Sequence, residues 1–344
     1  MMRETVKRNA TIDYLKAFAA VFVVLGHAFT YLESTGGSNT PVSSVIGILV
    51  SAVHVPLFFL VSGFLCHRQP LKKYYGKKAK RILIPFFFFT ALKLVFTQFV
   101  SRDFAHGANL AETLVSYFLI GSAYWFIYCI FIIYMIAPLF WQKDETKPPY
   151  IPISALAVFT ILNLVLSFAG DGAIFPESVK LFGITVKTPL FQIERVIIYM
   201  PYFLAGMLIK RYENKIIPFF DKAKLPLAVI CVIIAAACTV PVYMGVLRKA
   251  EVKLPLAFAL MFLLRAAAKR LPDNVRVLKT VGGYSLQAML FDGLFRVALF
   301  AAVGHFFTLN ALWAALITAV NITLTCLCCT VIKKIPYIRV LFGL

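Results

Sequence analysis

Three ionisable side chains interrupt one apolar stretch near the start of the chain. Asp13, Lys16 and His27 lie within residues 11–31, TIDYLKAFAAVFVVLGHAFTY, a segment long enough to cross a bilayer as a helix, which takes about 20 residues. On such a helix Lys16 and His27 lie within roughly 20° of each other, and Asp13 falls on the same side. Lys16 and His27 are then about 16 Å apart along the helix axis.

This polar stripe predicts a functional cavity inside a membrane protein. Ionisable groups at membrane depth are costly and usually face a bundle interior or a water-filled space. An imidazole titrates near neutral pH, so His27 is suited to take a proton from a hydroxyl group. The alternative stays open that Asp13 and Lys16 lie at the membrane interface and that His27 is a hydrogen-bonded packing residue.

A second candidate region combines polar residues of the next apolar stretch with a run of cations. His54 and Ser62 lie in residues 42–66, and the segment HRQPLKKYYGKKAKR follows. The cations that we single out there are Lys72, Lys73, Lys77, Lys78, Lys80 and Arg81. They anchor the loop on anionic lipid, worth about 1 kcal/mol per basic residue, or they attract a polyanionic cytoplasmic substrate.

A third candidate pair lies late in the chain. Asp292 and Arg296 are four residues apart within an apolar stretch, so the two side chains can pair on one helix face. We interpret them as a structural ion pair. The alternative is that Asp292 polarises His27 or a substrate hydroxyl.

The composition predicts an integral membrane protein. Of the 344 residues 61% are hydrophobic and the mean hydropathy is +0.84, which argues against a soluble enzyme. The net charge of +20 is a topology signal, and we predict no nucleic-acid partner. The seven cysteines fall in apolar segments, so we interpret them as packing residues and predict neither disulfides nor a metal site.

The hydropathy pattern predicts a single all-α domain over residues 1–344, a polytopic bundle of about ten helices of roughly 20 residues each. The expected spans lie at roughly 12–32, 42–66, 82–100, 122–141, 151–170, 191–210, 225–245, 254–270, 281–303 and 308–332. Most of the 35 Lys and Arg residues fall in loops on the side of the N-terminus. Because such residues concentrate in cytoplasmic loops, we predict a multi-pass plasma or inner membrane protein with both termini in the cytoplasm.

Several motifs resemble the acyltransferase 3 family of ten-span membrane acyltransferases. IDYLKAFAAVFVVLGH is similar to the signature of the first helix, in which an arginine and a histidine are separated by ten residues; here Lys16 stands in place of the arginine and His27 matches the histidine. HVPLFFLVSGFL and KKYYGKKAKRILIPFFFF resemble the next motifs, and AYWFIYCIFIIYMIAPLF, YMPYFLAGMLI and GGYSLQAMLFDGLF follow in the family's order. The likeness spans nearly the whole chain and is strongest for short members similar to fucose 4-O-acetylase.

The resemblance implies that the protein transfers an acyl group, usually acetyl from cytoplasmic acetyl-CoA, to a hydroxyl of a sugar or lipid-linked glycan on the outer side. His27 would be the general base, Lys16 would steady a charged part of the donor, and Asp13 would orient Lys16. The basic segment, with His54 and Ser62, would bind acyl-CoA, which is a substrate, so no bound cofactor is expected.

Two residues depart from the family pattern. Lys16 keeps the positive charge of an arginine but lacks its planar fork for phosphate or carboxylate. Asp292 stands where many members have a late histidine. Two other function classes compete with acyl transfer: a transporter or flippase for a polysaccharide or small molecule, and a non-catalytic membrane scaffold or sensor.

Overall fold

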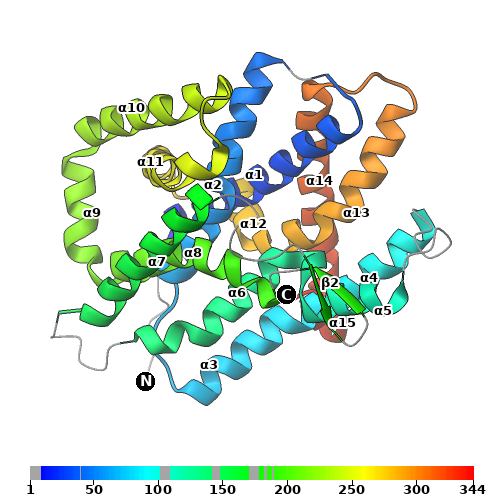
Figure 1. The fold of residues 1–344 in the computed structure, drawn as a ribbon, viewed down its shortest axis with the longest axis horizontal. Coiled ribbons are helices and arrows are strands. Elements are labelled where there is room, and N and C mark those ends of the chain that lie inside the picture. Colours follow the sequence, from blue (N-terminus) through cyan, green and yellow to red (C-terminus); the bar gives the residue numbers. More distant parts are fainter. Residues whose placement is uncertain are drawn as a thin grey trace. The chain divides into compact units, whose positions relative to one another are not determined.

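The computed structural model describes residues 9–38, 40–100, 109–141, 148–169, 178–181, 184–187 and 190–344. These residues are helical apart from short connections and one hairpin, whose strands β1 (Ser178–Leu181) and β2 (Ile184–Lys187) pair antiparallel with Ser178 opposite Lys187. The chain divides into two compact units, one formed by Met1–Val61 and Ile217–Leu327 and the other by Ser62–Ile216 and Cys328–Leu344. Each unit is described by itself below (Figure 1).

The first unit is built around the N-terminal helix. Its helices are α1 (Ala10–Ser34), most of α2 (Pro41–Phe64), the end of α9 (Glu213–Lys222), α10 (Lys224–Tyr243), α11 (Lys249–Arg270), α12 (Arg276–Gly283), α13 (Ser285–Gly304) and most of α14 (Ala311–Ile332). Helix α1 packs against α11, α12 and α13. It ends at a turn in which Gly36 has φ +76°, the left-handed conformation in which glycine commonly ends a helix.

The second unit holds the basic segment and the middle of the chain. Its helical elements are α3 (Leu71–Lys78), η1 (Ala79–Leu83), α4 (Ile84–Val100), α5 (Leu110–Leu114), η2 (Val115–Leu119), η3 (Ser122–Tyr124), α6 (Trp125–Ile136), η4 (Ala137–Phe140), α7 (Tyr150–Ala169), η5 (Leu190–Gln192), α8 (Ile193–Arg211) and α15 (Pro336–Leu341). A Cβ atom on Gly63 would lie 1.9 Å from the carbonyl oxygen of Phe203. The backbones of α2 and α8 therefore touch here, which is possible because glycine has no side chain.

Seven helices among the described residues are long and apolar enough to cross a membrane: α1, α2, the helix over Ser122–Phe140, α7, α10, α13 and α14. The other three expected spans, roughly 82–100, 191–210 and 254–270, also form helices. However, α4 has 17 residues, and α8 and α11 carry charged side chains in their first and last turns. The predicted number of about ten spans is therefore not confirmed.

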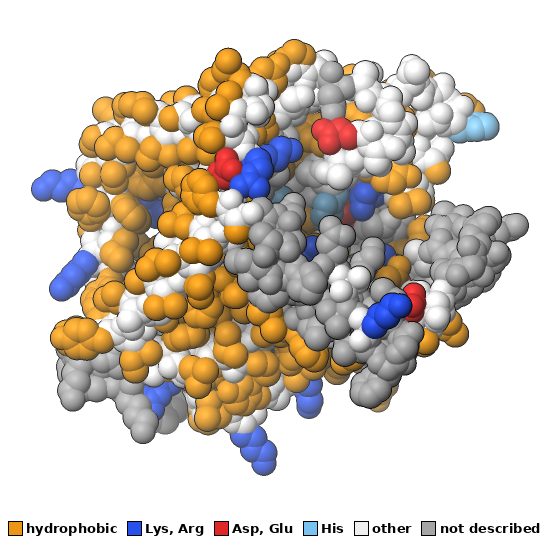
Figure 2. All heavy atoms as spheres, viewed as in Figure 1, with side chains coloured by type: hydrophobic (Ala, Val, Ile, Leu, Met, Phe, Trp, Pro, Cys, Tyr) orange, Lys and Arg blue, Asp and Glu red, His pale blue; other side chains and the backbone are white. Residues whose placement is uncertain are grey.

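The surface agrees with an integral membrane protein. Hydrophobic side chains cover much of the visible face in Figure 2, and charged groups are sparse on it. Only 11% of the apolar stretch of α7 and 22% of that of α10 is buried. Apolar helices with so much exposed surface are stable facing lipid, whereas in water they would form an aggregation-prone patch.

Candidate functional site

A buried carboxylate in the first unit joins three polar side chains from three helices. Asp292 of α13, whose side chain is 2% exposed, accepts a hydrogen bond from His27 Nδ1 of α1, with 2.7 Å between Nδ1 and Oδ2. The same oxygen lies 3.3 Å from Nε of Arg296. Asn321 of α14 donates from Nδ2 to the other oxygen, Oδ1, at 3.1 Å. Asp292 is thus the centre of a network that spans α1, α13 and α14.

The contacts of α1 with α12 and α13 hold His27 against this carboxylate. A Cβ on Gly282 of α12 would lie 2.1 Å from the carbonyl oxygen of Asp13, so the backbones of α1 and α12 touch. The Tyr14 hydroxyl donates to the carbonyl of Pro272 and accepts from the N–H of Val275, in the loop before α12.

At the other end of α1, aromatic contacts continue the interface with α13. The rings of Tyr31 and Phe300 contact each other at a tilt of 52°, with their centres 4.9 Å apart. Phe29, Leu32, Phe300 and Ile317 are buried together in one apolar cluster. His27 lies between these two sets of contacts along α1, so packing at both ends of the helix limits its rotation.

The geometry gives His27 a defined tautomer. A carboxylate has only acceptor oxygens, and the donors Arg296 and Asn321 stabilise its anionic form, so Nδ1 of His27 carries the hydrogen. In the neutral ring Nε2 then has a lone pair. The described residues supply no hydrogen-bond partner for Nε2, and the His27 side chain is 44% exposed. The ring can therefore accept a proton from a hydroxyl group placed beside Nε2.

The sequence predicted part of this arrangement. The ion pair between Asp292 and Arg296, expected from their i,i+4 spacing, is present. The interpretation of this pair as purely structural does not include the contact between Asp292 and His27. That contact corresponds to the alternative, in which Asp292 polarises His27. Asn321 was missed, although an amide inside an apolar span is itself a signal of an internal polar contact.

Lys16 and Asp13 lie together on the first part of α1. Their closest charged atoms, Lys16 Nζ and Asp13 Oδ1, are 3.9 Å apart, and the side chains are 27% and 4% exposed. The i,i+3 spacing thus brings them within ion-pair distance, as predicted.

His54 of α2 lies in the neighbourhood of the same site. Its Nδ1 donates to the carbonyl oxygen of Val50 at 2.6 Å, and a Cβ on Gly26 would lie 3.3 Å from the Val50 side chain. The His54 ring is close enough to interact electrostatically with His27 and with Lys253 of α11. Of the residues assigned to substrate binding, His54 is the one that the first unit brings near His27.

The basic segment lies in the second unit, and its six cations differ in environment. Five are exposed: Lys72, Lys73, Lys77, Lys80 and Arg81. Lys78 is half-buried, with its ammonium 3.3 Å from the ring centre of Tyr134. Burial lowers the pKa of Lys78 from 10.5 to about 8, and the positive charges of Arg81 and Lys77 add to the effect. Lys78 is thus distinct from the other cations, and Ser62 lies beside the hydroxyl of Tyr134.

Comparison with known proteins agrees with the sequence resemblance. The family model described as an acyltransferase domain, that of acyltransferase 3, matches residues 9–331. The nodulation protein NolL of Mesorhizobium japonicum is 28% identical over 160 residues, which covers 45% of this chain and 42% of the relative. NolL of Sinorhizobium fredii is 27% identical over 166 residues, or 46% and 44%. The matched region thus spans less than half the length of these curated relatives. No solved structure gives a significant match.

Proposed function

The chain belongs to the acyltransferase 3 family, and from this premise we propose that it is a membrane-embedded O-acyltransferase. It moves an acyl group, which we propose is acetyl, from cytoplasmic acyl-CoA to a hydroxyl of a sugar or lipid-linked glycan on the outer side of the membrane. The observation that carries the proposal is the hydrogen bond of 2.7 Å between His27 Nδ1 and the buried carboxylate of Asp292. A histidine fixed in this way is the recurrent general base of acyl transfer to hydroxyl groups.

In the proposed step, Nε2 of His27 takes the proton of the acceptor hydroxyl while the hydroxyl oxygen attacks the thioester carbonyl. The new C–O bond forms, the C–S bond breaks, and the proton passes from the imidazolium to the thiolate of CoA. Asp292 stabilises the transient imidazolium, as a carboxylate does in a catalytic triad. Arg296 and Asn321 hold that carboxylate in place.

The donor is proposed to bind through positive charge. Lys16, steadied by Asp13 at 3.9 Å, neutralises part of acyl-CoA. The five exposed cations of the basic segment raise the local concentration of the CoA phosphates and contact anionic lipid. The ammonium of Lys78, which lies over the ring of Tyr134, is partly desolvated. It therefore interacts more strongly with a phosphate than a fully hydrated ammonium does.

The charge distribution supports the proposed location. We assign the protein to the plasma or inner membrane, with both termini in the cytoplasm, because most Lys and Arg residues fall in the loops on that side. Acyl-CoA is made in the cytoplasm, so this orientation puts the basic segment on the donor side.

The test is acyl transfer by the purified full-length chain, with radiolabelled acetyl-CoA and candidate glycans. His27→Ala should be as abundant and as thermally stable as the wild type and should lose about 10²- to 10⁴-fold in rate, the usual contribution of a general base. His305→Ala is the matched control, because His305 is an exposed histidine of the same unit. Full transfer activity in a folded His27→Ala protein would rule out the assignment, and glycan transport without acetylation would favour a transporter.

A further inference from the structure

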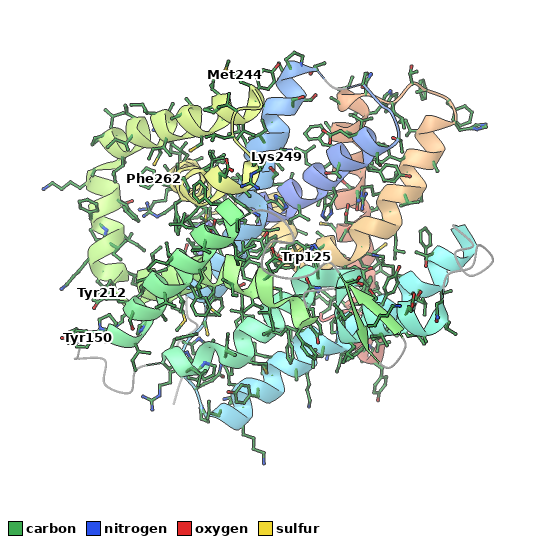
Figure 3. All side chains as sticks on the ribbon, viewed as in Figure 1. Trp125, Tyr150, Tyr212, Met244, Lys249 and Phe262 are labelled. Carbon is green, nitrogen blue, oxygen red and sulfur yellow. The ribbon has the colours of Figure 1, made fainter. Side chains whose placement is uncertain are left out.

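Arg195, in the second unit, has no carboxylate within ion-pair distance among the described residues; the neighbouring Glu194 acts on it only as a more distant charge. It lies in the first turn of α8, within an expected membrane span. Its guanidinium carbon is 4.3 Å from the ring centre of Trp125, a residue labelled in Figure 3. Among the residues that the structure describes, no carboxylate oxygen lies within 4.0 Å of the guanidinium. Ionised groups within membrane spans are costly and commonly mark functional sites.

The guanidinium is held in a fixed position from two sides. Nη1 donates to Oε1 of Gln192 at 2.9 Å, and Gln192 in turn donates from Nε2 to the carbonyl of Ile120 at 3.0 Å. Gln192 is 5% exposed. On the other side, the Trp125 ring stacks on Tyr199, with the ring centres 5.7 Å apart and the planes at 25°. Neither partner of Arg195 can move without disturbing a buried neighbour.

The backbone before α8 adopts an unusual conformation that contributes to this arrangement. Phe191 and Gln192 have φ angles of 55° and 56°, in the left-handed region that residues other than glycine rarely adopt. These two residues form the turn that enters α8, and Gln192 precedes Arg195 by three positions. The turn therefore places the buried Gln192 amide beside the guanidinium.

We propose that Arg195, held on Trp125 by Gln192, binds a carboxylate or phosphate group. A guanidinium has five N–H donors in one plane, the hydrogen bond to Gln192 uses one, and stacking on an aromatic face uses none. The remaining in-plane donors form the fork that binds a carboxylate or phosphate through two parallel hydrogen bonds. The anion belongs to the acceptor, because the predicted topology puts the start of this span on the outer side; this last assignment rests on the proposed function.

Tryptophan fluorescence gives a direct test, because Trp125 lies against the Arg195 guanidinium. The chain has two other tryptophans, which must be replaced first. The variant Trp141→Phe, Trp313→Phe leaves Trp125 as the sole reporter. In phosphatidylcholine nanodiscs, inorganic phosphate should change its emission saturably, whereas chloride at equal ionic strength should not. Arg195→Gln should weaken the phosphate response by about 10- to 100-fold, the value of a charge-assisted hydrogen bond.

A second variant keeps the test valid if Arg195→Gln does not fold. Gln192→Glu supplies a carboxylate beside Nη1, so it should also remove the phosphate response while Arg195 stays in place. A saturable response that survives both substitutions, or no saturable response in the reporter protein, would overturn the proposal.

Two further measurements identify the source of the anion. If a lipid headgroup occupies the site, nanodiscs of phosphatidylglycerol should abolish the phosphate response. If the acceptor does, the response should be equal in both lipids, and Arg195→Gln should raise KM for an anionic acceptor while KM for acetyl-CoA stays unchanged. Absence of acyl transfer by the wild type would count against the proposed function, whereas the phosphate titration would still decide whether Arg195 binds anions.

Discussion

Replacing Asp292 with asparagine is the sharpest test of the candidate site, because it keeps the shape of the side chain and removes one acceptor. The carboxylate accepts from His27 Nδ1 and Arg296 Nε on one oxygen and from Asn321 Nδ2 on the other. An amide has only one oxygen, so in either orientation its NH₂ group meets a donor. If the NH₂ group faces His27, the ring must take the tautomer with hydrogen on Nε2, which removes the lone pair that accepts the substrate proton.

The expected size of the effect follows from this geometry. Loss of the base should slow acyl transfer by about 10²- to 10⁴-fold, which corresponds to about 2.7–5.4 kcal/mol in activation free energy. The free energy of unfolding should fall by about 1–3 kcal/mol, because one buried donor loses its acceptor. A folded protein with little activity is therefore expected.

The competing account, an ion pair that is structural alone, makes a different set of predictions. Removing either partner would then strand a charge at a cost of about 3–5 kcal/mol. Asp292→Asn and Arg296→Leu would both lower thermal stability in detergent, and the double variant would recover stability and activity together. The base assignment instead predicts that the double variant stays inactive.

Measuring thermal unfolding and acetyl transfer for all three variants separates the two accounts. Asp273→Asn is the matched control, because Asp273 lies exposed in the loop before α12. Wild-type activity in a stable Asp292→Asn protein would refute the reasoning, since it would show that the tautomer of His27 does not matter.

Substitutions at three other positions, Lys16, Lys78 and Asn321, give further tests. Lys16→Arg should retain activity, and Lys16→Met should raise KM for acyl-CoA by about tenfold. Equal kinetics in the two variants would show that Lys16 does not bind the donor and only lies at the membrane interface. Because the pKa of Lys78 is lowered to about 8, affinity for acyl-CoA should weaken as pH rises through this value, and Lys78→Arg should flatten that profile since arginine stays charged. Between pH 8 and pH 10.5, about the two pKa values of Lys78, this side chain is protonated in the unfolded chain but not in the folded protein. The free energy of unfolding of the wild type should therefore rise with pH in this window, and that of Lys78→Met should not. Asn321→Leu should lower kcat by about 10- to 100-fold through misplacement of Asp292 and leave thermal stability near the wild type, because Oδ1 of Asn321 is buried without a partner among the described residues; parallel losses of stability and rate would make Asn321 a structural residue.

Local spacing allowed the contacts within one helix to be predicted. Lys16 pairs with Asp13 and Arg296 pairs with Asp292 because residues three or four apart share a face of a helix, and this depends on no other part of the chain. The same rule applies to Tyr74 and Lys78, which are four residues apart: Tyr74 is buried, and Lys78 is the one of the six cations that is not exposed. We read the cations there as one run of charge, and so did not separate Lys78 from its exposed neighbours.

Contacts between distant helices and unusual backbone conformations could not be predicted in this way. The hydrogen bond between His27 and Asp292 joins residues 265 positions apart, and spacing within α1 does not reveal which helix packs on it. The left-handed conformation of Phe191 and Gln192 is set by tertiary contacts rather than by residue type, because neither residue favours it. The number of spans is not confirmed at α4, which has 17 residues, nor at α8 and α11, whose ends carry charges, because hydropathy alone does not define a boundary there.

The register of α1 is the feature on which the candidate chemistry depends most. A slip of one residue would rotate His27 by about 100° and move it about 1.5 Å along the axis, so the hydrogen bond with Asp292 would be lost. Two contacts oppose such a slip: the backbone of α1 meets Gly282 at Asp13, and the Tyr14 hydroxyl is tied to the loop before α12. Helices α12 and α13 are almost continuous in the chain, so these contacts fix α1 against the same segment that carries Asp292. Gly282 and Tyr14 therefore determine which face of α1 meets the carboxylate, and the chemistry proposed for His27 depends on them.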